Sequence, residues 1–186
     1  MLTTDRLILR QWTEDDFAPF YRMCSDPDVM EFFPSRLTEE ESDAMARKIQ
    51  SLIQERDWGF WAVELRGLDK FIGFTGLHMP KANLPFAPCV EVGWRLAKEH
   101  WNRGYATEAA TAALHYAFEQ LVLDEVVSFT AQTNQRSQAV MEKLGMSNTG
   151  ENFMHPDVPD DSTLREHVLY RITRSEWQEK YTSHFE

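Results

Sequence analysis

Four residues between a strand pattern and an alanine-rich helix pattern are the strongest candidates for chemistry in this sequence. They are Arg103, Gly104, Tyr105 and Ala106, which follow the alternating segment 90–96 and directly precede the helix. The first turn of a helix leaves backbone N–H groups without intrahelical partners, and the helix dipole adds partial positive charge there. Small residues at 104 and 106 would let a diphosphate approach the backbone. The segment indicates an anion-binding turn, and the simpler alternative is a glycine turn that only starts a helix.

The strand before this turn carries a carboxylate. Alternation assigns its residues to two faces: Val90, Val92, Trp94 and Leu96 to one, and Glu91, Gly93 and Arg95 to the other. The Glu91 carboxylate therefore projects from a strand that we expect in the centre of the sheet.

Further helices and strands must position these residues. Thr13 with Asp16 and Thr38 with Glu41 have the spacing of helix-starting boxes, and Gly145 has the type expected at a helix end. Apolar periodicity predicts helices from residue 17, over 38–56, 106–118 and 134–144, and in the tail. Strands are expected over 7–9, 59–65, 71–79, 90–96, 126–131, 146–152 and 167–172, with a hairpin turn at 66–69.

Composition limits the class of protein. The 186 residues, 42% hydrophobic and 26% charged, predict one globular domain over 1–186. Thirty acidic against nineteen basic residues give a net charge of −11, which argues against nucleic acid as a partner because backbone binding needs a basic surplus. Two cysteines and no signal-like or long apolar segment predict a cytoplasmic protein without a membrane anchor.

Segments spread along nearly the whole chain share one family's motifs in order. They are residues 4–10, 72–74, 91–94, 101–109, 134–137 and 140–146. In these segments the chain resembles the GNAT superfamily of acyl-CoA-dependent N-acyltransferases and, within it, the RimJ/RimL-like branch. The family's phosphate-loop pattern is Gln/Arg-x-x-Gly-x-Gly/Ala; Gly104 and Ala106 match it, and Trp101 stands where Gln or Arg is usual.

The resemblance implies a fold and a cosubstrate. The fold is a single α/β (α+β) domain with a twisted, mostly antiparallel mixed sheet, splayed between the fourth and fifth strands, and helices on both faces. The cosubstrate is acetyl-CoA, with the strand 90–96 holding its pantetheine arm. The implied coenzyme contacts are Val92, Trp94, Leu96, Asn102, Arg103, Gly104, Tyr105, Ala106, Thr107, Asn134 and Ser137.

The implied reaction is direct transfer of an acetyl group to a primary amine in a ternary complex. Such a reaction needs a base for the amine and an acid for the leaving thiolate. Glu91 is the candidate base, and Ser137 and Tyr170 are candidate acids. Each has a structural alternative: Glu91 could pair with Arg95 or another cation, and Tyr170 could be a core residue. Ser137 could be an ordinary first-turn residue, and Asn134 also suits a helix N-cap.

Other chemistries find less support in the residues. Cys89 could suggest a Cys/His nucleophile, but no sequence cue pairs it with a histidine, so a bystander role is expected. The histidines are scattered without a His-Glu-x-x-His or Cys/His grouping, which gives no metal site.

The acceptor is the least defined part. Side chains near the expected amine entry are Phe32, Phe33, Trp58, Phe60, Trp61, Phe153, His155 and Arg165, and most of these aromatics suit a core equally well. An acidic loop with Asp157, Asp160 and Asp161 could attract a cationic amine. The expected acceptor is a protein N-terminus or a small-molecule amine, and the expected assembly is a monomer or homodimer. The alternative function is a non-catalytic coenzyme A-binding sensor or interaction module.

Overall fold

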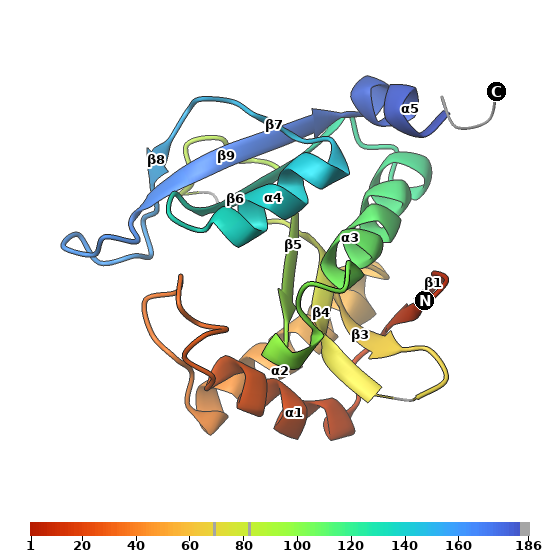
Figure 1. Cartoon of the computed structure of the whole chain (residues 1–186), viewed down its shortest axis with the longest axis vertical. Coiled ribbons are helices and arrows are strands. Elements are labelled where there is room, and N and C mark those ends of the chain that lie inside the picture. Colours follow the sequence, from red (N-terminus) through yellow and green to blue (C-terminus); the bar gives the residue numbers. More distant parts are fainter. Residues whose placement is uncertain (69, 82, 183–186) are drawn as a thin grey trace.

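A mixed sheet flanked by helices forms the part of the chain that the computed structural model describes, residues 1–68, 70–81 and 83–182 (Figure 1). Its strands are β1 Leu2–Thr3, β2 Leu7–Arg10, β3 Phe60–Leu65, β4 Lys70–His78, β5 Glu91–Leu96, β6 Glu125–Ala131, β7 Ser147–Asn148, β8 Phe153–Met154 and β9 Glu166–Thr173. Its α-helices are α1 Phe17–Cys24, α2 Glu39–Arg56, α3 Tyr105–His115, α4 Gln135–Leu144 and α5 Arg174–Thr182.

The strand order is β1-β2-β3-β4-β5-β6-β9-β7, with β8 also paired to β9. All of these pairs are antiparallel except β5–β6, which is parallel. The parallel step follows from the long crossover through α3, because a parallel neighbour cannot be reached by a tight turn. The expected mostly antiparallel mixed sheet is confirmed.

The sheet is splayed at the parallel step. β4 and β5 pair over six residues, whereas the register of β5 with β6 contains the single pair Glu91–Val127. In Figure 1 β5 and β9 run in clearly different directions, with α1 and α2 near the lower half and α4 beside β6 and β9. The splay lies between the fourth and fifth of the expected strands, as the sequence predicts.

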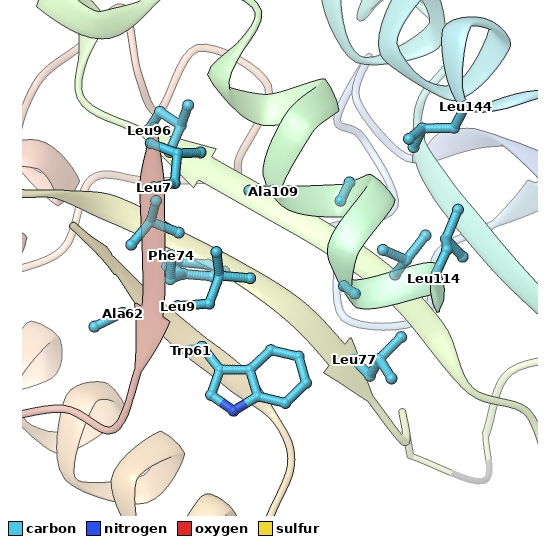
Figure 2. Packing of buried hydrophobic residues seen from close by; sticks show 14 of the residues in the cluster. Leu7, Leu9, Trp61, Ala62, Phe74, Leu77, Leu96, Ala109, Leu114 and Leu144 are labelled. Atoms are coloured by element: carbon cyan, nitrogen blue, oxygen red, sulfur yellow. The ribbon is translucent and has the colours of Figure 1, made fainter. Parts of the chain in front are cut away.

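Helices cover both faces of the sheet. On one face, Phe20 of α1 packs edge-on against Phe74 of β4, with ring centroids 6.0 Å apart. On the other face α3 lies against β4 and β5. Three alanines of α3, Ala109, Ala110 and Ala113, are fully buried, and so is Ala117 just after the helix. Small side chains let this helix approach the strands closely, and Figure 2 shows Ala109 and Leu114 beside the strand residues of the core.

Local sequence signals account for most element boundaries. Thr38 Oγ1 accepts a hydrogen bond from the Glu41 N–H at 3.2 Å, and the Glu41 carboxylate accepts one from the Thr38 N–H at 2.9 Å, which confirms the capping box before α2. Gly145 ends α4 with a φ of 87°, a left-handed conformation that favours glycine. Residues 66–68 form a turn after β3, within the hairpin turn expected over 66–69, and Asp69 lies outside the described residues.

Two boundaries differ from the sequence-based expectation. The strand expected over 146–152 is wrong: β7 spans two residues, a turn follows with Gly150 at a φ of 74°, and β8 adds two more. The turn at Gly150 separates the two short strands, and the sequence pattern alone did not reveal this interruption. The helix expected over 106–118 begins one residue earlier and changes after His115 into the π-helical turn Tyr116–Gln120.

Candidate active site

A cavity of about 660 Å³ occupies the splay between β5 and β6. Its walls come from β5, β6, the first turn of α3, the start of α4 and the segment after α1. The predicted coenzyme contacts that line it are Val92, Trp94, Leu96, Asn102, Gly104, Tyr105, Ala106, Thr107, Asn134 and Ser137. Arg103 is exposed and does not line it. The tertiary structure therefore gathers almost all of the predicted contacts around one space.

The turn before α3 presents unpaired backbone donors to this cavity. Gly104 has a φ of 79° and Asn102 one of 58°, so two left-handed residues redirect the chain into the helix. The Glu108 N–H bonds to the Gly104 carbonyl at 3.0 Å, which is the first intrahelical bond. The N–H groups of residues 105–107 precede that bond and have no intrahelical acceptor. Together with the helix dipole, this geometry suits an anion such as a diphosphate.

Arg6 holds this turn from outside. Its Nη1 donates to the Arg103 carbonyl at 2.9 Å, and its guanidinium lies 4.6 Å from the centroid of the Tyr105 ring. Sequence reasoning assigned no role to Arg6, although residues 4–10 and 101–109 were both among the family-like segments. The presence of both segments in the family's motifs could have indicated that they interact, and the structure shows that Arg6 contacts Arg103 and Tyr105.

One edge of β5 is free to bind an extended ligand. The Val90 carbonyl accepts from the Val127 N–H at 3.0 Å, and the Val92 carbonyl accepts from Ser128 Oγ at 2.9 Å. Backbone groups alternate along a strand, so those of Trp94 point to the same edge, beyond the point where β6 diverges. The next carbonyl on this edge, that of Leu96, accepts from the Trp101 indole at 2.8 Å. Trp101, which stands where the family pattern has Gln or Arg, thus occupies the last carbonyl on this edge.

Glu91 lies at the point of divergence and is half-buried in the cavity wall. Burial raises the pKa of its carboxyl to about 8. Within the described residues no cation forms an ion pair with it, so the alternative of a structural pair with Arg95 finds no support. A carboxyl that changes charge near pH 8 has the properties of a general base.

Asn134 and Ser137 form a small network at the start of α4. Asn134 Oδ1 accepts from the Ser137 N–H at 3.2 Å, which confirms its N-cap geometry. Asn134 Nδ2 then donates to Ser137 Oγ at 3.1 Å and to Thr130 Oγ1 at 2.9 Å. Because Ser137 Oγ accepts this bond, its own proton remains available to a group in the cavity.

Tyr170 is placed apart from the other predicted catalytic residues. Its side chain is buried between β9 and α4, where the hydroxyl donates to Gln138 Oε1 at 3.3 Å and to Glu142 Oε1 at 3.4 Å. It does not line the cavity. The side chain faces α4 because of its position on β9, so the structure agrees with the core alternative.

Cys89 does not have the properties of a nucleophile. Burial, reinforced by the charges of Glu91 and Glu125, raises the pKa of its thiol to about 11. A thiol with that pKa stays protonated near neutrality and reacts poorly.

The acceptor side of the cavity contains only part of the predicted set. Phe32, Phe33, Phe60 and His155 line the cavity, together with Asp157. The other residues of the set, Trp58, Trp61, Phe153, Arg165, Asp160 and Asp161, do not. Trp61 and Phe153 are core residues, and Arg165 instead pairs with Asp160 at 2.6 Å. Large aromatics are needed in the core, which is why their residue type alone could not separate pocket from interior.

Comparison with known families agrees with this geometry. Residues 6–147 match the family described as "Acetyltransferase (GNAT) domain". The chain belongs to the GNAT acetyltransferase family. Members of this family use acetyl-CoA as the acetyl donor.

Relatives of this GNAT protein extend over most of its length. The uncharacterized N-acetyltransferase YnaD of Bacillus subtilis is 30% identical over 177 residues, 95% of this chain and 98% of the relative. The FsC-acetyl coenzyme A-N(2)-transacetylase of Aspergillus fumigatus is 31% identical, covering 82% of this chain and 67% of the relative. The crystal structure of a GNAT-family acetyltransferase from Bacillus anthracis superposes with a TM-score of 0.77 at 26% identity, covering 94% and 98% of the two chains. These findings support an N-acetyltransferase enzyme over a non-catalytic module.

Within residues 1–68, 70–81 and 83–182, no group of three or more His, Cys, Asp and Glu side chains is placed to hold a metal ion. None of the helices in the same part of the chain has the length and hydropathy of a membrane span.

Proposed function

We propose that this GNAT protein transfers an acetyl group from acetyl-CoA to a primary amine by direct attack in a ternary complex. The position of Glu91 carries the proposal. Its carboxyl lies where β5 and β6 diverge, on the same cavity as the first turn of α3. A base and an anion-binding turn that share one cavity suit a reaction between an amine and a phosphate-bearing donor.

Two features of the splay suit coenzyme A: the first turn of α3 and the edge of β5. The unpaired N–H groups of residues 105–107 would hold the diphosphate, and the loop residues Asn102, Arg103 and Gly104 would shape that site with their backbone. The free edge of β5 at Trp94 would bond the pantetheine arm, with Val92 and Leu96 beside it. Acetyl-CoA supplies an acetyl group already activated as a thioester, so the chain need not form a covalent intermediate.

Glu91 is proposed to accept the proton of the incoming amine, directly or through one water. A base is most effective when its pKa lies near the working pH, because it is then both ionised and basic enough. Burial raises the pKa of the Glu91 carboxyl to about 8, which suits proton transfer from an amine at neutral to mildly alkaline pH.

Ser137 is proposed to protonate the departing thiolate. Its hydroxyl lines the cavity, and the bond from Asn134 Nδ2 orients it with its proton free. Tyr170 is not carried into this role because its hydroxyl bonds to Gln138 and Glu142 instead.

The acceptor class is proposed from sequence motifs. Residues 4–10 and 101–109 resemble the RimJ/RimL-like branch, which makes a protein N-terminal α-amine one candidate acceptor and a small-molecule amine the other. We place the enzyme in the cytoplasm as a monomer or homodimer, and the free thiols of Cys24 and Cys89 agree with a reducing compartment.

Release of the coenzyme thiol tests the proposal. Purified protein is incubated with acetyl-CoA and a panel of amines and N-terminal peptides, and free thiol and acetylated product are measured together. Amine-dependent thiol release with matching product is expected. Tight coenzyme binding without release for any amine would contradict acetyl transfer and favour a binding module.

A further inference from the structure

Arg95 is a cation on the cavity wall, and its guanidinium lies close to two aromatic rings. The central carbon of its guanidinium lies 4.2 Å from the centroid of the Phe33 ring and 5.3 Å from that of Phe74, and Nη1 donates to Cys24 Sγ at 3.3 Å. Nε is buried and unpaired. Among the described residues, no Asp or Glu lies within ion-pair distance of this guanidinium.

Cys24 does not neutralise this charge. Burial raises the pKa of the Cys24 thiol, and the nearby Arg95 charge offsets only part of that effect, so the thiol stays neutral. An arginine remains protonated at every accessible pH. Removing an unpaired charge from water is costly, and the two aromatic rings compensate only part of that cost. A partner that arrives with the substrate would complete the site.

The base and this cation share one face of β5. Glu91, Gly93 and Arg95 alternate with the residues that face α3, so all three border the same side of the strand. Four residues of strand place the α-carbons of Glu91 and Arg95 about 13 Å apart. Gly93 lies between them without a side chain, and a β-carbon there would meet the Phe60 ring at 3.1 Å. Along this face the Glu91 carboxyl comes first, then the Phe60 ring that covers Gly93, and then the Arg95 guanidinium.

We infer that Arg95 binds a carboxylate of the acceptor, and that the preferred acceptor is an amine with a carboxylate at the far end of a short apolar chain, an ω-amino carboxylate in chemical class. This inference rests on the proposed function, because the acceptor amine is placed at Glu91. The planar guanidinium has the geometry to hold both oxygens of a carboxylate. A phosphate dianion would call for a second cation, and the other Arg and Lys side chains that line the cavity, Arg136 and Lys143, extend from α4.

Two acceptors that differ only in the remote group test the inference. 6-Aminohexanoate and its neutral amide share one chain length and one amine. The wild-type enzyme is expected to favour the carboxylate by about tenfold or more in kcat/KM, the scale of one charge-assisted hydrogen-bonded pair. In Arg95→Met the preference is expected to fall to about one, and Arg95→Lys should keep part of it. Arg171→Met, an exposed arginine on β9 outside the cavity, is the matched control and should keep the wild-type ratio.

Calorimetric binding of 6-aminohexanoate to the coenzyme A complex gives a readout independent of turnover. Carboxylate-dependent binding that weakens in Arg95→Met supports the site; equal affinity for acid and amide in the wild type overturns it, even if Arg95→Met does not fold. Equal turnover of both acceptors also overturns the role of Arg95 and leaves acetyl transfer intact. Absence of thiol release with every amine contradicts the proposed function, and the binding comparison then still decides on Arg95.

Discussion

Arg6 and Glu108 form an ion pair that joins the start of the chain to the helix whose first turn lines the cavity. Arg6 Nε lies 2.6 Å from Glu108 Oε2, and Glu108 Oε1 accepts from the Arg6 N–H at 3.0 Å and from the Thr4 hydroxyl at 2.6 Å. Burial acts to raise the pKa of Glu108, but these bonds outweigh it and the pKa is lowered. The carboxylate is therefore charged and fixed, and it holds the guanidinium that in turn holds the Arg103 carbonyl.

Arg6→Met is expected to weaken acetyl-CoA binding because it frees the loop that carries the anion-binding turn. The pair is partly exposed, so the expected loss is about threefold to tenfold in Kd, or ~1 kcal/mol. Calorimetry measures it, with the exposed Arg47→Met on α2 as control. Glu108→Gln should cause a similar loss, and the double variant should lose little more than either single one. Fully additive losses would contradict a shared role.

Gly104→Glu should abolish acetyl-CoA binding, because it places bulk and negative charge beside the unpaired N–H groups of the first turn of α3. Gly104→Ala separates conformation from charge. Its β-carbon would lie no closer than 3.4 Å to Arg6 Nη2, so the main cost is the φ of 79°, on the order of 1 kcal/mol. Partial loss in the alanine variant and complete loss in the glutamate variant are expected. Binding like the wild type in Gly104→Glu would remove the diphosphate assignment.

Glu91→Gln should reduce kcat by about 10²-fold or more, the usual contribution of a positioned base. The wild-type rate should rise with pH around 8, where the Glu91 carboxyl ionises. Glutamine is nearly isosteric with glutamate and cannot titrate. The rate of the variant should therefore not rise around pH 8 and should follow only the ionisation of the amine. Coenzyme binding by calorimetry serves as the control. The same pH profile in both proteins would leave Glu91 with a structural role only.

The same carboxyl should also make stability depend on pH. Its pKa is about 8 in the folded protein against an ordinary 4.5, so the folded state binds more protons between these values. The contribution of Glu91 is therefore fully present below about pH 4.5 and is lost as pH rises through 8. Chemical denaturation measures the free energy of unfolding of Glu91→Gln minus that of the wild type at two pH values. This difference should be more favourable to the variant at pH 8.5 than at pH 5.5, by at least ~1 kcal/mol. An equal difference at both pH values would mean that the carboxyl is not desolvated.

Ser137→Ala and Tyr170→Phe together test the identity of the acid. Each variant removes one hydroxyl and leaves the rest of the side chain. Ser137→Ala is expected to lower kcat by about 10-fold to 10²-fold, because the thiolate then leaves without a proton donor. Tyr170→Phe should keep the wild-type kcat and lose stability by about 1 kcal/mol through its hydrogen bonds to Gln138 and Glu142. The reverse pattern in steady-state kinetics would assign the acid to Tyr170.

The sequence by itself determined the elements whose signals are local. The capping box at Thr38 and Glu41 predicts the start of α2, and the alternation in residues 90–96 predicts which side chains of β5 share a face. The stripe of small residues that begins at Ala106 predicts a helix close to the sheet, because alanine side chains on one face let the helix axis approach the strands. These patterns depend on neighbours along the chain, so they can be read from order alone.

Only the tertiary structure decided which residues meet. The strand expected over 146–152 became two short strands because pairing with β9, and not alternation, sets their length. Ser137 and Tyr170 were both candidate acids by residue type, and only the structure shows that the Tyr170 hydroxyl lies against α4 and outside the cavity. Arg6 pairs with Glu108, and Arg95 lies close to the rings of Phe33 and Phe74, through contacts between segments distant in sequence. Burial and partnership are properties of the packed chain, and local spacing does not encode them.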